Sequence, residues 1–193
     1  MPRNQFQRMI FALMTVIVTV HAYVFYSIYV INGSTFVSNA QAYGCESSHV
    51  LDAVNYQGGV PMFGTYMPIW AVILIEFCLA YLLECVMGSP LSFKLACKVF
   101  DPKTTHPVIF ESAVICATVG LMCPSMSLIA AAIYYPYQWM DFHVWTLLAN
   151  WLKLVCYNFP FAFFTQLFFI QPFIRKMFKI LFRKDIASRK QEW

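Results

Sequence analysis

The chain has 193 residues, of which 60% are hydrophobic and only 11% are charged. Because soluble domains usually contain about 25% charged residues, this composition excludes an ordinary soluble enzyme or binding domain. The formal net charge of +4 does not predict nucleic-acid binding, since the basic residues gather near the termini and in one short loop.

Four long apolar segments account for more than half of the chain. They are Phe6–Ile31, Tyr66–Met87, Pro107–Tyr135 and Trp145–Phe173. Each can form a helix that crosses the hydrocarbon core of a bilayer, which is about 30 Å thick and needs roughly 20 residues. We therefore predict an all-α integral membrane protein with four transmembrane helices. Too little of the chain is left over for a separate soluble catalytic domain.

The cations between and around these segments lie on alternate sides. Arg3 and Arg8 precede the first helix, three lysines follow the second, and seven cations follow Pro172. The first and third loops contain acidic residues and no cation. Because cytoplasmic loops carry an excess of Lys and Arg, we predict that both termini and the second loop are cytoplasmic. An even number of helices agrees with this N-in/C-in arrangement.

The connecting segments predict some local structure. The external loop 32–65 contains Gly58-Gly59, which favours a turn, and its middle, Cys45–Asn55, can form one short helix. Pro90 and Pro172 are each expected to bend or end a helix near the cytoplasmic face. After Pro172, cations alternate with apolar residues. This tail is either a basic amphipathic helix on the membrane surface or a simple extension of the fourth helix.

The second and fourth segments resemble each other when they are aligned 82 residues apart. The matching positions are Glu76 with Asn158, Glu84 with Gln166, Pro90 with Pro172, and Lys94 with Lys176. The first and third segments match more weakly at an offset of 99, with Phe11 on Phe110 and Thr19 on Thr118. Apolar helices also resemble one another by chance. We interpret the pattern as a duplicated helical hairpin, with units at 1–97 and 98–193 in parallel orientation.

The C-terminal half contains a short motif: Trp151, then Phe159-Pro160, then Pro172-Phe173-Ile174-Arg175. With the alternating Met and Ser of 122–127, it resembles a bacterial family of two-helix membrane proteins catalogued as domain of unknown function 2798 (DUF2798). The resemblance covers roughly Pro107–Phe182. The N-terminal half departs from it, since Phe77-Cys78 replaces Phe-Pro. The resemblance implies a multi-pass protein of the bacterial cytoplasmic (inner) membrane and no known activity.

Polar residues inside the apolar segments are the candidate functional residues. They form a predicted intramembrane cluster of His21, Glu76, Lys153, Asn158 and Gln166, with the carboxylates Glu84 and Glu111 near the inner ends. An ionisable side chain at the centre of a transmembrane helix costs about 2.5–3.5 kcal/mol, so such residues are usually functional.

Two of these residues lie at similar depth. Glu76 and Lys153 are both about ten residues or fewer below the external ends of their helices, and we predict an ion pair between them. In the alternative, Lys153 extends to the external headgroups. His21 either takes part in proton or ligand binding or makes one interhelical hydrogen bond. Tyr134 and other aromatic residues at helix ends are assigned to the interfacial belt.

Three functions are compatible with these features. The first is a protein that moves or gates a small solute or proton past the polar cluster. The second is a structural or accessory subunit that binds another membrane protein. The third, a membrane-embedded lipid-modifying enzyme, is the least favoured because no nucleophile and base can be assembled. No metal, cofactor or nucleic acid is predicted. The expected partners are membrane lipids and either a second copy or another membrane protein.

Overall fold

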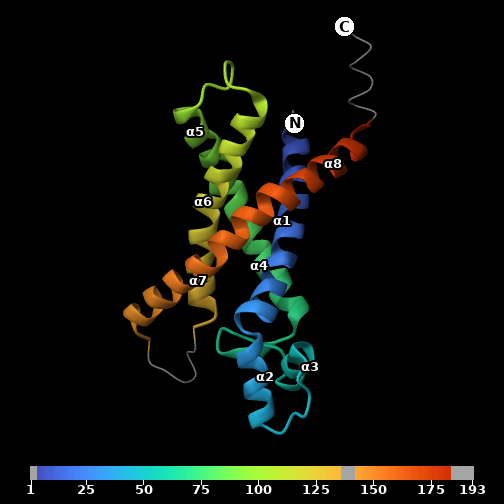
Figure 1. Cartoon of the computed structure of the whole chain (residues 1–193), viewed down its shortest axis with the longest axis vertical. Coiled ribbons are helices and arrows are strands. Elements are labelled where there is room, and N and C mark those ends of the chain that lie inside the picture. Colours follow the sequence, from blue (N-terminus) through green and yellow to red (C-terminus); the bar gives the residue numbers. More distant parts are fainter. Residues whose placement is uncertain (1–3, 136–141, 184–193) are drawn as a thin grey trace.

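The computed structural model describes residues 4–135 and 142–183 and consists mainly of long helices (Figure 1). Four helical stretches are long and apolar enough to cross a membrane, as predicted: Gln5–Ile31, Ile69–Val99, Pro107–Ile133 and Val144–Leu181. The second and fourth extend beyond their predicted ends at Met87 and Phe173. The predicted boundary between residues 97 and 98 therefore falls inside a helix, and the next turn begins at Phe100.

Three of the four stretches contain a π-helical turn. The first is α1 (Gln5–Tyr26) followed by η1 (Ser27–Ile31), and the third is the single helix α6 (Pro107–Ile133). The second consists of α4 (Ile69–Leu83), η2 (Glu84–Gly88) and α5 (Ser89–Val99). The fourth consists of α7 (Val144–Phe164), η3 (Thr165–Ile170) and α8 (Gln171–Leu181).

Of the two predicted outcomes, a bend or an end of the helix, the prolines after η2 and η3 do not produce the second. Pro90 and Pro172 each occupy the first turn of a new α-helical segment, directly after a π-helical turn. A π turn shifts the backbone hydrogen bonds by one residue, so the missing N–H of proline is accommodated without ending the helix. As far as Leu181, the residues after Pro172 therefore form an extension of the fourth helix. Its apolar face packs inward, because Ile174 and Phe178 on α8 are buried.

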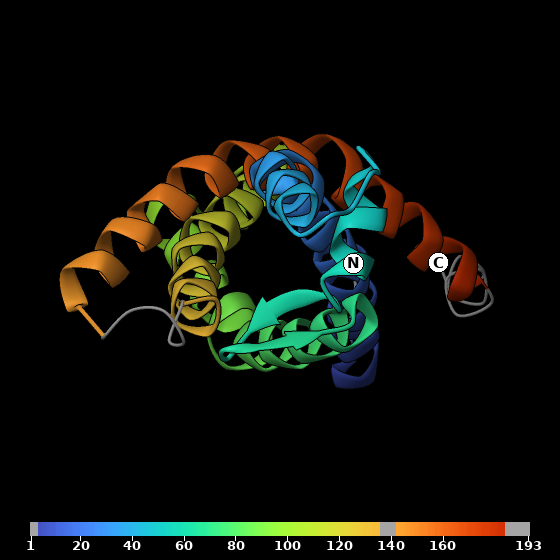
Figure 2. The ribbon, with the colours of Figure 1, turned by 90° about the horizontal axis from the view of Figure 1, so that it is seen from below.

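The fourth stretch crosses the others obliquely. The helix from α7 to α8 passes over α6 and α1, so that α7 contacts α6 and α8 contacts α1 (Figures 1 and 2). The second stretch makes the corresponding contacts, because α4 packs on α1 and α5 packs on α6. The end of the second stretch, α5, thus contacts the C-terminal half. The end of the fourth stretch, α8, contacts the N-terminal half.

Burial repeats along the chain at the offsets seen in the sequence. The buried residues of the described fourth stretch are Ala162, Ile170, Ile174 and Phe178, and each has a buried counterpart 82 residues earlier: Ala80, Gly88, Ser92 and Ala96. At an offset of 99, Val20, Val24 and Ile28 correspond to Val119, Cys123 and Ser127, all buried. The π turns η2 and η3 also coincide at the first offset.

One end of the bundle is covered by a small cap made from loop 32–65. It contains α2 (Gly33–Ala42), α3 (Val50–Tyr56) and an antiparallel hairpin of β1 (Val60–Met62) and β2 (Thr65–Met67). The helix expected over Cys45–Asn55 begins later, at Val50. The hairpin was not predicted. Its two-residue turn, Phe63-Gly64, has positive φ at both positions, which suits the twist of paired strands.

The cap is attached to the spanning helices at several points. The backbone N–H of Phe63 donates to the carbonyl of Ile133 at the end of α6 (2.9 Å), and Met62 is fully buried. Val54 of α3 is also fully buried, in the same hydrophobic cluster as Val20 and Val24 of α1. The cap thus packs on one end of the bundle, which we name the capped end. The opposite end, where Arg8, Lys94 and Lys179 lie, is named the basic end (Figure 1).

Candidate intramembrane cavity

A cavity of about 920 Å³ lies between the helices. Its lining comes from α1, α4, η2, α5, α6, α7, η3 and α8, so residues far apart in sequence contribute to it. On α1 the lining residues recur every three or four positions from Arg8 to Tyr23, which is one face of the helix. At 1.5 Å per residue, this face is about 22 Å long. The cavity therefore runs along much of the thickness of a bilayer, which is about 30 Å in its hydrocarbon part.

Four of the predicted polar residues line this cavity: Glu76, Glu84, Glu111 and Gln166. They come from α4, η2, α6 and η3, and each is only partly exposed. Glu76 and Glu84 share one helix face, as their spacing of eight residues predicts. The cavity also has three threonines, Thr15, Thr19 and Thr118, although most of its lining is apolar.

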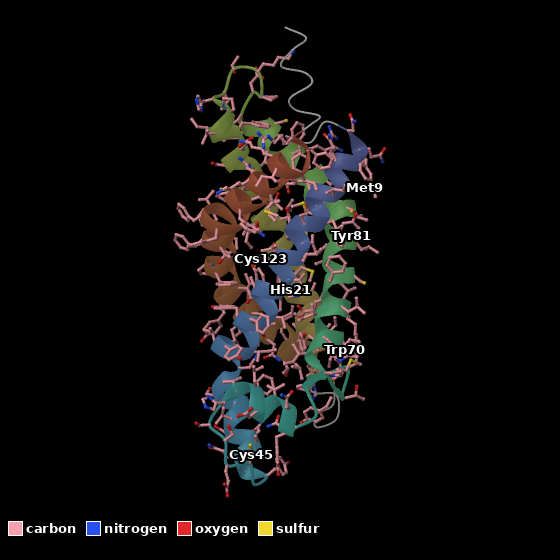
Figure 3. All side chains as sticks on the ribbon, turned by 90° about the vertical axis from the view of Figure 1, so that its right-hand side faces the viewer. Met9, His21, Cys45, Trp70, Tyr81 and Cys123 are labelled. Carbon is pink, nitrogen blue, oxygen red and sulfur yellow. The ribbon has the colours of Figure 1, made fainter. Side chains whose placement is uncertain are left out.

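The other three predicted residues lie outside the cavity lining. His21 is exposed, and its Nδ1 is 2.8 Å from the carbonyl oxygen of Ile17 in its own helix. It lies midway along α1, between the levels of Met9 and Trp70 (Figure 3). Asn158 donates to the hydroxyl of Ser127 on α6 (3.3 Å), so it joins two helices. Lys153 is exposed on α7. Of the five residues predicted as one intramembrane cluster, only Glu76 and Gln166 therefore line the cavity.

The predicted ion pair between Glu76 and Lys153 is not formed. Among residues 4–135 and 142–183, the ion pair present is that of Arg175 with Glu111. Glu76 instead accepts a hydrogen bond from the hydroxyl of Tyr134, directly after α6. Two residues at equal depth meet only if their helices also turn them toward each other. The side chain of Lys153 is exposed, whereas that of Glu76 lines the cavity.

The bond between Glu76 and Tyr134 lies near the part of the cavity lining that is closest to the cap. Glu76, Tyr23 and Met126 are the lining residues nearest the capped end, and no residue of α2, α3, β1 or β2 belongs to the lining. Sequence reasoning placed Tyr134 in the interfacial belt and missed this contact. The available signal was position, since Tyr134 ends the third span on the side from which α4 begins. A phenol there can reach a carboxylate about two turns from the start of α4.

Gln166 and Glu84, which match at the offset of 82 residues, each have a hydrogen-bond partner. The Gln166 amide donates to the hydroxyl of Thr19 on α1 (2.7 Å), which joins the fourth stretch to the first. Glu84 accepts a hydrogen bond from the hydroxyl of Ser89, one turn further along its own chain (2.6 Å). The Thr19 hydroxyl in turn donates to the carbonyl of Thr15 (2.7 Å). These bonds hold polar side chains at the cavity wall.

The basic end of the cavity is lined by cations that were predicted only as topology signals. Arg8 on α1, Lys94 on α5, and Arg175 and Lys179 on α8 are all lining residues. Arg175 forms the ion pair with Glu111 on α6, with 34% and 20% of the two side chains exposed. This pair joins the last helix to the third span. The sequence lacked a signal for it beyond the presence of opposite charges near the same membrane face.

Residues 106–182 match the model of domain of unknown function 2798. This confirms the resemblance that was predicted for the C-terminal half. The DUF2798 segment comprises α6, α7, η3 and α8, and it therefore supplies Glu111, Gln166 and Arg175 to the cavity. Glu76 and Glu84 come from the half outside the match. At a significant level, neither a curated protein nor a solved structure matches the chain.

Proposed function

We propose that this membrane protein moves or gates protons, or a small solute, through the cavity between its helices. The observation that supports this most directly is the position of Glu76 and Glu84, two carboxyl groups on the wall of a cavity inside apolar spanning helices. Ionisable residues are expensive in hydrocarbon, and those that face a cavity usually belong to ion or proton paths.

The geometry suggests how such a path is gated. Glu76, among the lining residues nearest the capped end, is held by the Tyr134 hydroxyl. Glu84 lies eight residues further toward the basic end, which is about 12 Å along the helix. Protons would pass between the two carboxyl groups through water in the cavity. Release of Glu76 from Tyr134 would connect the cavity to the capped side.

Proton movement can be measured in liposomes that contain an entrapped pH-sensitive dye and are driven by a potassium gradient with valinomycin. Wild-type protein should acidify the interior faster than protein-free vesicles do. Glu76→Gln should reduce the rate to that of protein-free vesicles, because the amide cannot take up a proton. Tyr134→Phe should raise the rate, since it removes the hydrogen bond that holds the Glu76 side chain in place.

The matched control is Glu46→Gln, which removes one exposed carboxylate from the cap and leaves the cavity lining unchanged. Its rate should equal that of the wild type. Equal rates for the wild type, Tyr134→Phe and protein-free vesicles would contradict proton movement. That result would favour an accessory subunit, in which the Glu76–Tyr134 bond only fixes the register of α4 against α6.

We also propose the N-in/C-in orientation in a bacterial inner membrane. Within the described residues, every Lys and Arg except Lys153 lies at the basic end, and the long cap lies at the other. This one-sided distribution is the pattern of the positive-inside rule. The bacterial location is supported by the resemblance of the C-terminal half to DUF2798.

The two halves, we further propose, are duplicated hairpins related by an axis along the bundle. Support comes from the shared burial pattern and from π turns at equivalent positions. Two edge-to-face ring pairs also join the halves, although of their four rings only Phe11 and Phe110 match at the repeat offsets: Phe11 packs on Phe178 at 5.6 Å, and Phe93 packs on Phe110 at 5.7 Å. Both pairs join the first helix of one half to the end of the second helix of the other.

A further inference from the structure

The basic end of the cavity has positive charge that the proposed proton path does not use. Arg8, Lys94 and Lys179 line it from three different helices, and all three side chains are exposed. None of them forms an ion pair with another described residue. The remaining lining cation, Arg175, is neutralised by Glu111. Three uncompensated cations therefore converge at one end of a single cavity.

Behind these cations the wall is mainly hydrocarbon. On α1 it includes Phe11, Val16 and Val20, and on α6 it includes Val114 and Val119. This apolar surface follows one face of each helix for several turns, over the roughly 22 Å between Arg8 and Tyr23. Large apolar cavities bind hydrocarbon more readily than water. One leaflet of a bilayer is about 15 Å of hydrocarbon, so the cavity is long enough for an acyl chain.

We propose that the cavity binds an anionic phospholipid. Its acyl chain lies between α1 and α6, and its headgroup lies at Arg8, Lys94 and Lys179. Charge decides the class of lipid, because clustered Lys and Arg at a membrane surface favour anionic headgroups. Glu76, at the far end of the lining, lies beyond the reach of the headgroup. This binding goes beyond the proton path and does not depend on it, although a bound chain would displace the water that protons need.

Native mass spectrometry of the purified full chain tests the proposal by counting retained lipids. The probes are dioleoyl phosphatidylglycerol, which is anionic, and dioleoyl phosphatidylcholine, which has the same chains without net charge. The wild type should retain phosphatidylglycerol in preference. The triple variant Arg8→Gln/Lys94→Gln/Lys179→Gln should lose this preference by about tenfold or more, because each cation near the surface contributes to it.

The matched control is Lys98→Gln/Lys103→Gln/Lys176→Gln, which removes three exposed cations of the same end that do not line the cavity. It should keep the wild-type preference. Val119→Trp, which fills the apolar part, should reduce retention of both lipids. Excess glycerol phosphate, a headgroup without chains, should not displace the lipid.

Three results would overturn the proposal. The first is equal retention of both lipids by the wild type, and the second is an equal loss in the two triple variants, which would indicate general surface attraction. The third is displacement by glycerol phosphate, which would indicate a site for the phosphate group alone. Proton flux is measured separately, so a lipid site without flux, or flux without a lipid site, identifies which proposal has failed.

Discussion

Glu76 has a neutral partner, the Tyr134 hydroxyl, where a cationic one was expected. A hydroxyl donor can hold a carboxylate whether or not the carboxylate is charged, since a protonated carboxyl group can still accept through its other oxygen. A lysine would favour the charged form alone. A carboxyl group with a hydroxyl partner, such as Glu76, can therefore take up and release a proton without losing its position. Glu111 differs, because its partner Arg175 is permanently charged.

Gly88 and Gly120 provide a matched pair of residues for a stability test. A Cβ added at Gly88 would lie 2.3 Å from Oε2 of Glu84 and 3.0 Å from Sδ of Met122, whereas one added at Gly120 meets nothing within 4 Å. Gly88→Ala must displace the Glu84 carboxylate from the wall and should lower stability by about 1–3 kcal/mol. Gly120→Ala should be neutral or stabilising, by up to about 1 kcal/mol, because alanine favours the helix.

Thermal unfolding of both variants in the same detergent measures this difference. Equal melting temperatures would contradict the tight packing of η2 against α6. If Gly120→Ala were the less stable of the two, the assignment of its face as open would be wrong.

The π-helical turns are the elements that shape the bundle. In each half, a π turn precedes the proline and lets the helix continue into a segment that packs on the other half: α5 on α6 and α8 on α1. A helix that ended at Pro90 or Pro172 could not make these contacts. Because π turns are frequent at functional sites, the position of Glu84 within η2 and of Gln166 within η3 supports the proposed path.

We call the packing of α5 on α6 and of α8 on α1 the crosswise contacts. Because these contacts join the two halves, we predict that the halves associate without a covalent link. We expect chains 1–101 and 102–193 to co-purify when they are co-expressed, since the cut falls in the turn between α5 and α6. Phe110→Ala with Phe178→Ala should reduce the yield of complex severalfold, because both rings are at least 90% buried and pack across the halves.

The control for this experiment is Phe168→Ala with Phe169→Ala, which removes two rings that are 59% and 71% exposed. Its yield should match that of the unaltered halves. Halves that each insert into membranes but do not associate would remove the crosswise contacts as support for the duplication.

The molecule as a whole has two unlike ends. The capped end has a folded lid with fully buried residues, whereas the basic end has a cavity lined by exposed cations. The cavity lining includes cations of the basic end and no residue of α2, α3, β1 or β2, so under the proposed function the cavity would be entered from the basic end. With the proposed orientation, that side is the cytoplasm.

Labelling of single cysteines tests the orientation. In one variant Cys45, in the cap, is the only cysteine retained, and in a second Lys103→Cys is introduced into a cysteine-free chain. With intact cells and a maleimide that does not cross membranes, Cys45 should react and residue 103 should react only after lysis. Reaction of residue 103 in intact cells, with Cys45 protected, would show that the orientation is inverted.

Much of this architecture was determined by the sequence alone. The number of spanning helices, the separation of cations to one end and the resemblance of the C-terminal half to DUF2798 all depend on composition and local order, which the chain displays directly. The repeat offsets also predicted which positions correspond, and Ala80 and Ala162, which match at an offset of 82, are both buried.

The tertiary structure decided which polar residues share a site. Depth along a helix can be counted in residues, but the direction in which a side chain points depends on how the helices rotate and cross. For this reason Glu76 and Gln166 line the cavity, while Lys153 and His21, at comparable depth, lie outside it. The rotation of the helices also placed Arg8, Lys94 and Lys179, from separate segments, in the lining of the same cavity. Two π turns, which the prolines alone do not predict, contributed to this arrangement because they let α5 and α8 continue.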